Sequence, residues 1–258
     1  MIYLPILFII AFCILFYFFQ EKFIFLNGKK LNKNYQYQFL YSFKELFIKA
    51  KDNTLINAVH FKLENPKGII LFCHGNKGNL TKWGNRVSYL LDYNYEVILF
   101  DYRNYGKSVG AFNEQKMYQD ALQMYQYVNT MYNEDKIVVY GYSIGCTFAT
   151  KIAEKYKPKH LVLESPFYSL KKAVQKAFFL APTFLLKYKF KTHTFFKNVQ
   201  VPICIFQGKK DRVTPIKGAK KLFQLNNNPV NSFITLQEAT HHNIRTFKLY
   251  KQKLQEIL

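Results

Sequence analysis

From residue 46 onward, short apolar segments typical of buried strands alternate with segments of helical periodicity. The runs GIILFCHG at 68–75 and YEVILFDYR at 95–103 suit strands that are covered on both faces. Residues 114–131 carry apolar side chains at every third or fourth position, which is the spacing of an amphipathic helix. This alternation predicts an α/β fold with a mostly parallel sheet and helices on both of its faces.

The same criteria assign the remaining elements of this domain. Further strands are expected at 46–51, 54–63, 136–143, 160–166, 202–210 and 231–237, and further helices at 81–92, 144–156, 215–225 and 245–258. One segment, residues 167–199, interrupts the alternation because it is too long for a simple crossover between two strands. It contains many aromatic residues, seven lysines and no acidic residue.

The first 19 residues, MIYLPILFIIAFCILFYFF, form an uncharged apolar run close to the ~20 residues that a helix needs to cross a bilayer. A cleaved signal peptide is the alternative, and it has a positive amino end, a shorter apolar core and a small-residue cleavage site. No Lys or Arg precedes this run, and no such cleavage site follows it. We therefore expect a transmembrane anchor at 1–20, a connector at 21–45 and the α/β domain at 46–258.

Charge gives a first indication of partners and of membrane orientation. The chain has 37 basic and 16 acidic residues, a formal net charge of +21, which attracts polyanions such as anionic lipid headgroups or nucleic acid. No zinc-ligand spacing, RNP-like aromatic motif or basic helix indicates a nucleic-acid-binding module. Lysines directly follow the apolar run, which by the positive-inside rule places the domain on the cytoplasmic side, although lysine is abundant throughout the chain.

The four cysteines stand singly, at positions 13, 73, 146 and 204, without CxxC spacing or a histidine partner pattern. Such isolated cysteines do not indicate a metal site, and buried free thiols are the expectation.

Gly141-Tyr142-Ser143-Ile144-Gly145 ends an expected strand and opens an expected helix. A G-x-S-x-G turn in this context is sharp and strained, so the positions two residues before and after the serine must lack bulk. A serine hydroxyl is a poor nucleophile at neutral pH and needs an adjacent base. Ser143 is therefore the predicted nucleophile, and its partners should follow in the order acid, then histidine.

A single aspartate, Asp211, follows Ser143 in the chain. It comes directly after the apolar run at 202–210, at the carboxyl end of an expected strand, where catalytic groups gather in open parallel sheets. Two histidines remain beyond it, His241 and His242, both in a loop before the last helix. The local sequence does not decide which of them is the base.

The loop that follows the strand at 68–75 is expected to supply an oxyanion donor. The backbone N–H of Asn76, together with that of Ile144, is predicted to hold the oxyanion of a tetrahedral intermediate. The loss of one such donor typically costs about 3 kcal/mol of transition-state stabilisation.

HGNKGN, DYRNYGKS, GYSIG, GKKDRVTP and HHN, in this order and spacing, resemble the α/β-hydrolase superfamily over residues 20–258. The most similar branch is membrane-tethered and single-domain, carries an HGNxGN loop and is described as serine aminopeptidase-like or lysophospholipase-like. Its relatives include the α/β-hydrolase-domain proteins that remove palmitoyl groups from proteins. The resemblance implies an α/β-hydrolase fold with an eight-stranded, mostly parallel sheet and a short cap, here residues 167–199.

The resemblance also assigns roles. It implies Ser143 as nucleophile, Asp211 as acid and His242 as base, since the family's histidine directly precedes an asparagine, here Asn243. It further implies oxyanion donors at the positions of Asn76 and Ile144. Two positions depart from the family pattern: Tyr142 stands where many relatives have Arg, and Asn104 where many have Gly.

Three functions are compatible with these features. The first is hydrolysis of a carboxylic ester or thioester of a small, lipid-like or acylated-protein substrate through an acyl-enzyme. The second is a serine peptidase on the same triad, but an exopeptidase usually needs a carboxylate for the substrate's amino group, and the cap contains none. The third is a non-catalytic membrane scaffold on a hydrolase fold. The triad is chemically sufficient, so neither a metal nor an organic cofactor is expected.

Overall fold

The computed structural model describes residues 3–258 and contains one eight-stranded sheet. In chain order its strands are β1 (Phe43–Lys49), β2 (Leu55–Phe61), β3 (Gly68–Cys73), β4 (Tyr95–Phe100), β5 (Ile137–Tyr142), β6 (His160–Glu164), β7 (Ile203–Gly208) and β8 (Ser232–Leu236). Their spatial order is β1-β2-β4-β3-β5-β6-β7-β8. β2 pairs antiparallel with both β1 and β4, and the strands from β4 to β8 pair in parallel.

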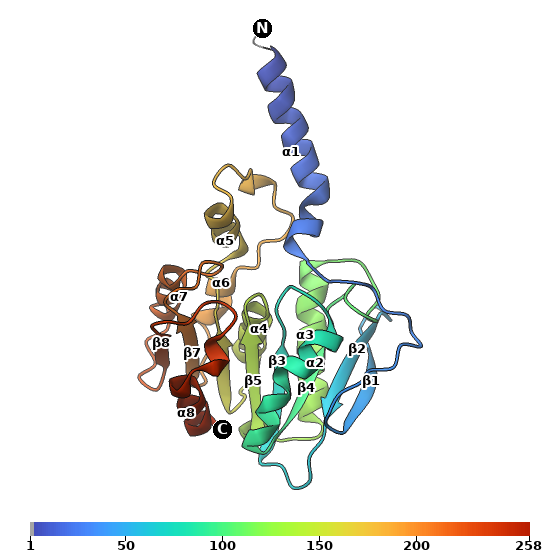
Figure 1. Cartoon of the computed structure of the whole chain (residues 1–258), viewed down its shortest axis with the longest axis vertical. Helices are drawn as coiled ribbons and strands as arrows, with labels where there is room; N and C mark the ends of the chain where they lie inside the picture. The colour runs from blue at the N-terminus through green and yellow to red at the C-terminus, as the bar shows by residue number, and fades with distance from the viewer. Residues whose placement is uncertain (1–2) are drawn as a thin grey trace.

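Helices cover both faces of this sheet (Figure 1). In chain order the helices are α1 (Tyr3–Ile24), α2 (Leu80–Val87), α3 (Glu114–Asn129), α4 (Gly145–Lys155), α5 (Leu170–Ala177), α6 (Thr192–Phe196), α7 (Ile216–Phe223) and α8 (Lys248–Ile257). Short 3₁₀ turns lie at Ser88–Tyr93, Glu134–Lys136, Thr183–Leu185 and Ile244–Thr246. Ala121 of α3 and Phe148 of α4 belong to the core on one face, and Trp83 of α2 and Tyr250 of α8 to the core on the other.

The central strand β3 shows why the sequence folds in this way. Successive side chains of a strand point to opposite faces of the sheet. Ile69 and Leu71 accordingly pack in one core, Ile70 and Phe72 in the other, and the strand is buried throughout. The predicted mostly parallel sheet with helices on both faces is confirmed.

Element boundaries differ from the expectations by a few residues where a turn depends on a left-handed backbone. The hairpin expected at 46–63 is formed by β1 and β2 but begins three residues earlier, at Phe43, and Asn53 in its turn has a φ of 64°. The helix expected at 81–92 ends as α2 at Val87 and continues as a 3₁₀ turn, which Asn94 terminates with a φ of 60°. Asparagine adopts this conformation more readily than other residues with a side chain.

Residues 167–199 form the expected short cap from α5, the 3₁₀ turn Thr183–Leu185 and α6. The Ser169 side chain begins α5 by accepting a hydrogen bond from the backbone N–H of Lys172. The 3₁₀ turn lies beside α1, and α5 packs against the turn.

α1 projects from the domain on the side of the cap (Figure 1). Its stretch Ile6–Ile24 is long and apolar enough to cross a membrane, and most of its side chains are exposed. Its carboxyl end, in contrast, enters the domain. Ile24 and Phe25 are buried, and the Phe25 ring stacks on Phe112 with 4.1 Å between centroids.

The parallel strands β3, β5, β6 and β7 lie in register, so their carboxyl ends meet at one edge of the sheet. The loops that follow β3, β5, β7 and β8 carry the predicted site residues. The topology therefore brings together segments that are up to 166 positions apart in the chain, from Asn76 to His242.

Candidate active site

Ser143 lies in the turn between β5 and α4, with a φ of 55°. This left-handed conformation is strained for a residue with a side chain, and such strain is frequent at functional sites. A Cβ on Gly145 would lie 1.9 Å from the carbonyl oxygen of Cys73, and one on Gly141 would lie 2.5 Å from the Cα of Cys146. Only glycine fits at these two positions, as the G-x-S-x-G pattern requires.

The backbone of the neighbouring strand holds this turn in place. The N–H of Ser143 donates a hydrogen bond of 2.9 Å to the carbonyl oxygen of Glu164 at the end of β6. The serine is therefore fixed at the carboxyl edge of the sheet by main-chain contacts to its neighbours.

Asp211 is buried in the loop after β7, where five hydrogen bonds hold its carboxylate, one of them donated by the Gln207 side-chain amide to Oδ2 at 3.2 Å. Its Oδ1 accepts from the N–H groups of Val213 and Thr214, at 2.9 and 2.8 Å. Its Oδ2 accepts from the Thr214 hydroxyl at 2.9 Å and from Nδ1 of His241 at 2.8 Å. Burial raises the pKa of Asp211, but the hydrogen bond and charge of His241, with the Thr214 N–H, outweigh burial and hold this pKa below its usual value.

The structure corrects the expectation that His242 is the partner of Asp211. His241 makes that contact, and its Nδ1–H donated to the carboxylate leaves Nε2 as the basic nitrogen of the ring. His242 instead places its Nδ1 3.3 Å from the Tyr142 hydroxyl. The two imidazole rings are 5.1 Å apart and lie at 85° to one another.

The loop at 240–243 explains why consecutive histidines face different ways. The Asn243 side chain accepts hydrogen bonds from the N–H and the hydroxyl of Thr240, at 2.7 and 2.9 Å, and closes a tight loop. His241 is buried in this loop, whereas His242 is exposed. Burial and the charges of His241 and Arg86 lower the pKa of His242. Asn243 therefore closes the loop. The histidine directly before it, His242, is not the one that contacts Asp211.

Tyr142, the departure from the family pattern, supports the histidine loop. Its hydroxyl donates a hydrogen bond of 2.7 Å to the carbonyl oxygen of His241. The Arg86 guanidinium lies 4.7 Å from the centre of the Tyr142 ring and donates to the carbonyl oxygen of His242 at 3.3 Å. Because Tyr142 is the last residue of β5, it connects the turn at Ser143 directly to the loop that carries both histidines.

The loop after β3 is fixed by contacts of Asn76. Its side chain donates to the carbonyl oxygen of Ile24 at 3.0 Å, and its own carbonyl oxygen accepts from the Tyr105 hydroxyl at 2.8 Å. Within the described part of the chain, the backbone N–H groups of Asn76 and Ile144 donate to no other group. Both are therefore available as donors, as oxyanion stabilisation requires.

Asn76 also lines a hollow of about 260 Å³, together with His241 and His242. Trp83 and Tyr142 form part of its wall, and three cationic side chains stand around it: Lys77, Lys82 and Arg86.

His74 and the segment after β4 support this edge of the sheet. His74 is fully buried, and its Nε2 lies 3.3 Å from Oδ1 of Asp101. Arg103 pairs with Asp120 of α3 at 2.6 Å and with Asp52 of the first hairpin at 2.9 Å. Asn104 has a φ of 63°, a left-handed backbone conformation that glycine adopts without strain.

Sequence reasoning did not single out Glu164. This buried carboxyl at the end of β6 accepts a hydrogen bond of 2.7 Å from the Tyr140 hydroxyl, and its Oε1 lies 3.7 Å from Nη2 of Arg86. Burial raises the pKa of Glu164, and the charge of Arg86 offsets part of this effect. In the sequence, Glu164 is an acidic residue at the end of an apolar run. This pattern does not reveal its partner Arg86, which stands 78 residues earlier in the chain.

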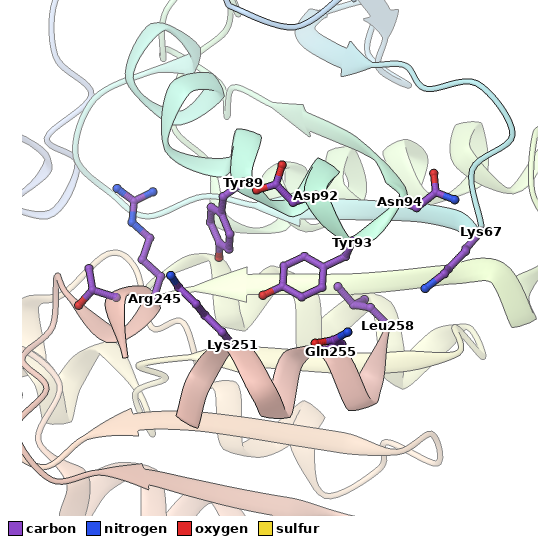
Figure 2. A pocket seen from close by; sticks show the side chains of 10 residues that line it. Lys67, Tyr89, Asp92, Tyr93, Asn94, Arg245, Lys251, Gln255 and Leu258 are labelled. Carbon is purple, nitrogen blue, oxygen red and sulfur yellow. The ribbon is translucent and has the colours of Figure 1, made fainter. Parts of the chain in front are cut away.

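A larger hollow of about 610 Å³ lies between the 3₁₀ turn Ser88–Tyr93 and α8 (Figure 2). No triad residue lines it, and Figure 2 shows Tyr89 and Tyr93 between the cationic side chains of Arg245, Lys251 and Lys67. The Tyr89 hydroxyl is hydrogen-bonded to that of Tyr250.

Comparisons with known proteins agree with this architecture. The family model described as alpha/beta hydrolase fold matches residues 68–201. The "Uncharacterized protein R595" of Acanthamoeba polyphaga mimivirus is 32% identical over 221 residues, which are 77% of this chain and 75% of that protein. Lysophosphatidylserine lipase ABHD12 of Macaca fascicularis is 28% identical over 63% of this chain, and the match spans 46% of that longer protein.

Among solved structures, an esterase from Pyrococcus furiosus superposes with a TM-score of 0.73. The superposition covers 91% of this chain and 96% of the esterase, at 19% sequence identity. It shows that the two proteins share a fold. The strand order, the strained serine turn and a family match over more than half of the sequence agree with one another. The chain belongs to the α/β-hydrolase-fold family.

Proposed function

We propose that this protein is a serine hydrolase that cleaves carboxylic esters or thioesters through an acyl-enzyme, with Ser143, His241 and Asp211 as its triad. The observation that carries the proposal is the buried Asp211–His241 pair at the sheet edge where Ser143 occupies its strained turn. The lipase and esterase relatives support ester hydrolysis as the class of reaction.

In this mechanism His241 accepts the proton of the Ser143 hydroxyl through Nε2 while the serine oxygen attacks the carbonyl carbon. The N–H groups of Asn76 and Ile144 stabilise the negative oxygen of the tetrahedral intermediate. His241 then gives its proton to the leaving alcohol or thiol, and water cleaves the acyl-enzyme by the same steps. Asp211 keeps the imidazole in the required tautomer and stabilises its protonated form.

A groove of about 480 Å³ is suited to an amphiphilic substrate. Aromatic and aliphatic side chains line it, and so do four lysines: Lys172, Lys176, Lys217 and Lys221. Its volume is within the range of small-molecule sites. Val213 lines both this groove and the hollow at His241. An acyl chain in the groove therefore lies next to the triad, with lysines available for an anionic headgroup.

The membrane anchor is part of this proposal. A signal peptide near an amino terminus can be as long and as apolar as this helix. The end of α1, however, packs into the domain. The carbonyl oxygen of Ile24 accepts a hydrogen bond from the Asn76 side chain, and Gln20 is buried against the cap. Our proposed organisation is an anchor at 1–20, a connector that ends before β1, and a hydrolase domain on the cytoplasmic side. The domain begins at Phe43, the first residue of β1, instead of at residue 46. Lysines after the span set the orientation.

The test is labelling of the membrane-bound protein by a serine-directed fluorophosphonate probe. The parent and a Ser88→Ala control should label, because Ser88 lies in a 3₁₀ turn away from the triad, whereas Ser143→Ala should not. Hydrolysis of p-nitrophenyl esters of increasing chain length should depend on Ser143 in the same way. A folded parent that does not label would overturn the proposal in favour of a non-catalytic scaffold.

A further inference from the structure

The outer end of the cap carries large apolar side chains that the described chain leaves uncovered. Phe179 is 89% exposed, Phe184 79% and Leu180 73%, and the neighbouring Phe178 is half exposed. These four residues lie within 178–184, which we call the cap tip. Several large exposed apolar side chains in one short segment indicate a site of interaction with a protein, a ligand or a membrane.

The cap tip lies against α1. The ring of Phe178 makes an edge-to-face contact with Phe12, with 6.3 Å between centroids. Just beyond the other end of the tip, the Gln20 side chain donates to the carbonyl oxygen of Leu185 at 3.2 Å and accepts from the N–H of Lys187 at 2.8 Å. The segment from 178 to 187 therefore runs along α1 between Phe12 and Gln20.

This contact fixes the depth of the cap tip relative to α1. Gln20 lies eight positions after Phe12, and at 1.5 Å of rise per residue this corresponds to about 12 Å of helix. If α1 crosses a bilayer with Gln20 at its polar boundary, Phe178 lies about 12 Å inside, within a hydrocarbon core that is about 30 Å thick.

Side chains around Gln20 suit such a boundary. The Lys187 ammonium lies 4.5 Å from the centre of the Tyr17 ring, and the Lys22 ammonium lies 5.0 Å from that of Phe19. The Tyr188 hydroxyl donates a hydrogen bond to Glu21 at 2.5 Å. Tyrosines and lysines with apolar stems are the residues that proteins place at membrane interfaces.

We infer that the cap tip inserts into the same leaflet as the end of α1, so that the hydrolase domain rests on the lipid surface through two neighbouring elements. The inference rests on the proposed anchor and extends it from α1 to the cap. It also specifies how substrate arrives. α5 leads directly from the tip to the lysine-lined groove, because Ala173 and Lys176 line that groove and Phe178 follows the helix. An acylated substrate therefore enters from the bilayer and not from the aqueous side.

The test uses the full chain in bilayers whose lipid acyl chains carry bromine atoms, which quench tryptophan fluorescence at a known depth. Three variants are compared with the parent, whose single Trp83 is buried and supplies the background signal. Phe179→Trp reports on the cap tip and Phe8→Trp on α1. Leu249→Trp reports on an exposed position of α8, at the end of the domain away from α1 (Figure 1).

We expect the tryptophans at 179 and 8 to lose fluorescence in brominated bilayers by at least a factor of two relative to unbrominated ones, and the one at 249 to behave as the parent does. Quenching at 8 with values at 179 equal to those at 249 would overturn the cap inference and leave the anchor standing. Absence of quenching at both 8 and 179 would overturn the anchor and the cap inference together. Equal quenching at all three positions would overturn the inference as well, because the domain would not be oriented on the bilayer.

Discussion

Nδ1 of His241 lies 2.8 Å from Oδ2 of Asp211, and the adjacent His242 makes no such contact within the described chain. In the proposed mechanism this contact makes His241 the base, because the carboxylate fixes the tautomer and the orientation of its ring. The same pair is reinforced by Thr214, whose hydroxyl donates to the carboxylate at 2.9 Å.

His241→Ala should lower kcat for a p-nitrophenyl ester by about 10⁴-fold or more, since the serine then has no base. His242→Ala is the matched variant one residue away, and it should change kcat by less than about tenfold because its ring does not contact Asp211. Steady-state kinetics of both variants decide the assignment. The opposite order of effects would return the role of base to His242.

Asp211→Asn should preserve the fold and lower kcat by about 10⁴-fold, because an amide no longer selects the tautomer with a basic Nε2. KM should change little, since the carboxylate is buried behind the imidazole. Asp135→Asn, at an exposed carboxylate, serves as the control and should keep the parent rate. A parent-like rate for Asp211→Asn would show that another acid supports the histidine.

Glu164→Gln should change how stability depends on pH. Burial raises the pKa of Glu164 in the folded protein above its unfolded value, so the folded state binds this proton more tightly. The stability from this group is fully present below the unfolded pKa and is lost as pH rises through the folded pKa. Thermal unfolding in detergent should therefore show the parent losing stability relative to Glu164→Gln as pH rises across that window. A constant difference at all pH values would contradict the prediction.

Gly145→Ala should prevent normal folding or destabilise the protein by about 4 kcal/mol or more, because its Cβ would lie 1.9 Å from the carbonyl oxygen of Cys73 at the end of β3. Gly218→Ala is the control, since no atom lies within 4 Å of a Cβ at that position of α7. It should stabilise the protein by about 0.5–1 kcal/mol, as alanine is the better helix former. Denaturant titration measures both effects, and a mild effect at 145 would show that the turn can relax.

Phe179→Ser combined with Leu180→Ser should lower kcat/KM about tenfold for an ester embedded in vesicles, because a polar cap tip no longer favours the lipid phase. Hydrolysis of a short, water-soluble ester should be unchanged, since neither residue lines the hollow at the triad. Leu249→Ser is the control for loss of an exposed apolar side chain. Equal losses on both substrates would indicate damage to the domain instead of weaker membrane contact.

The sequence by itself determined the layered α/β architecture and the strained turn at Ser143. Both depend on local information: apolar runs of strand and helix length, and two glycines at the positions where a Cβ would collide with the backbone. Asp211 followed by elimination, because it is the single aspartate after the nucleophile.

The tertiary structure decided which histidine meets Asp211, how Glu164 is buried, and where the cap lies along α1. Two consecutive histidines share nearly the same sequence context, and only the path of the loop at 240–243 turns one inward. The contacts between Glu164 and Arg86, and between Phe178 and Phe12, join positions 78 and 166 residues apart. Packing of the whole chain creates such pairs, because their attraction depends on distance in space and not on spacing in sequence.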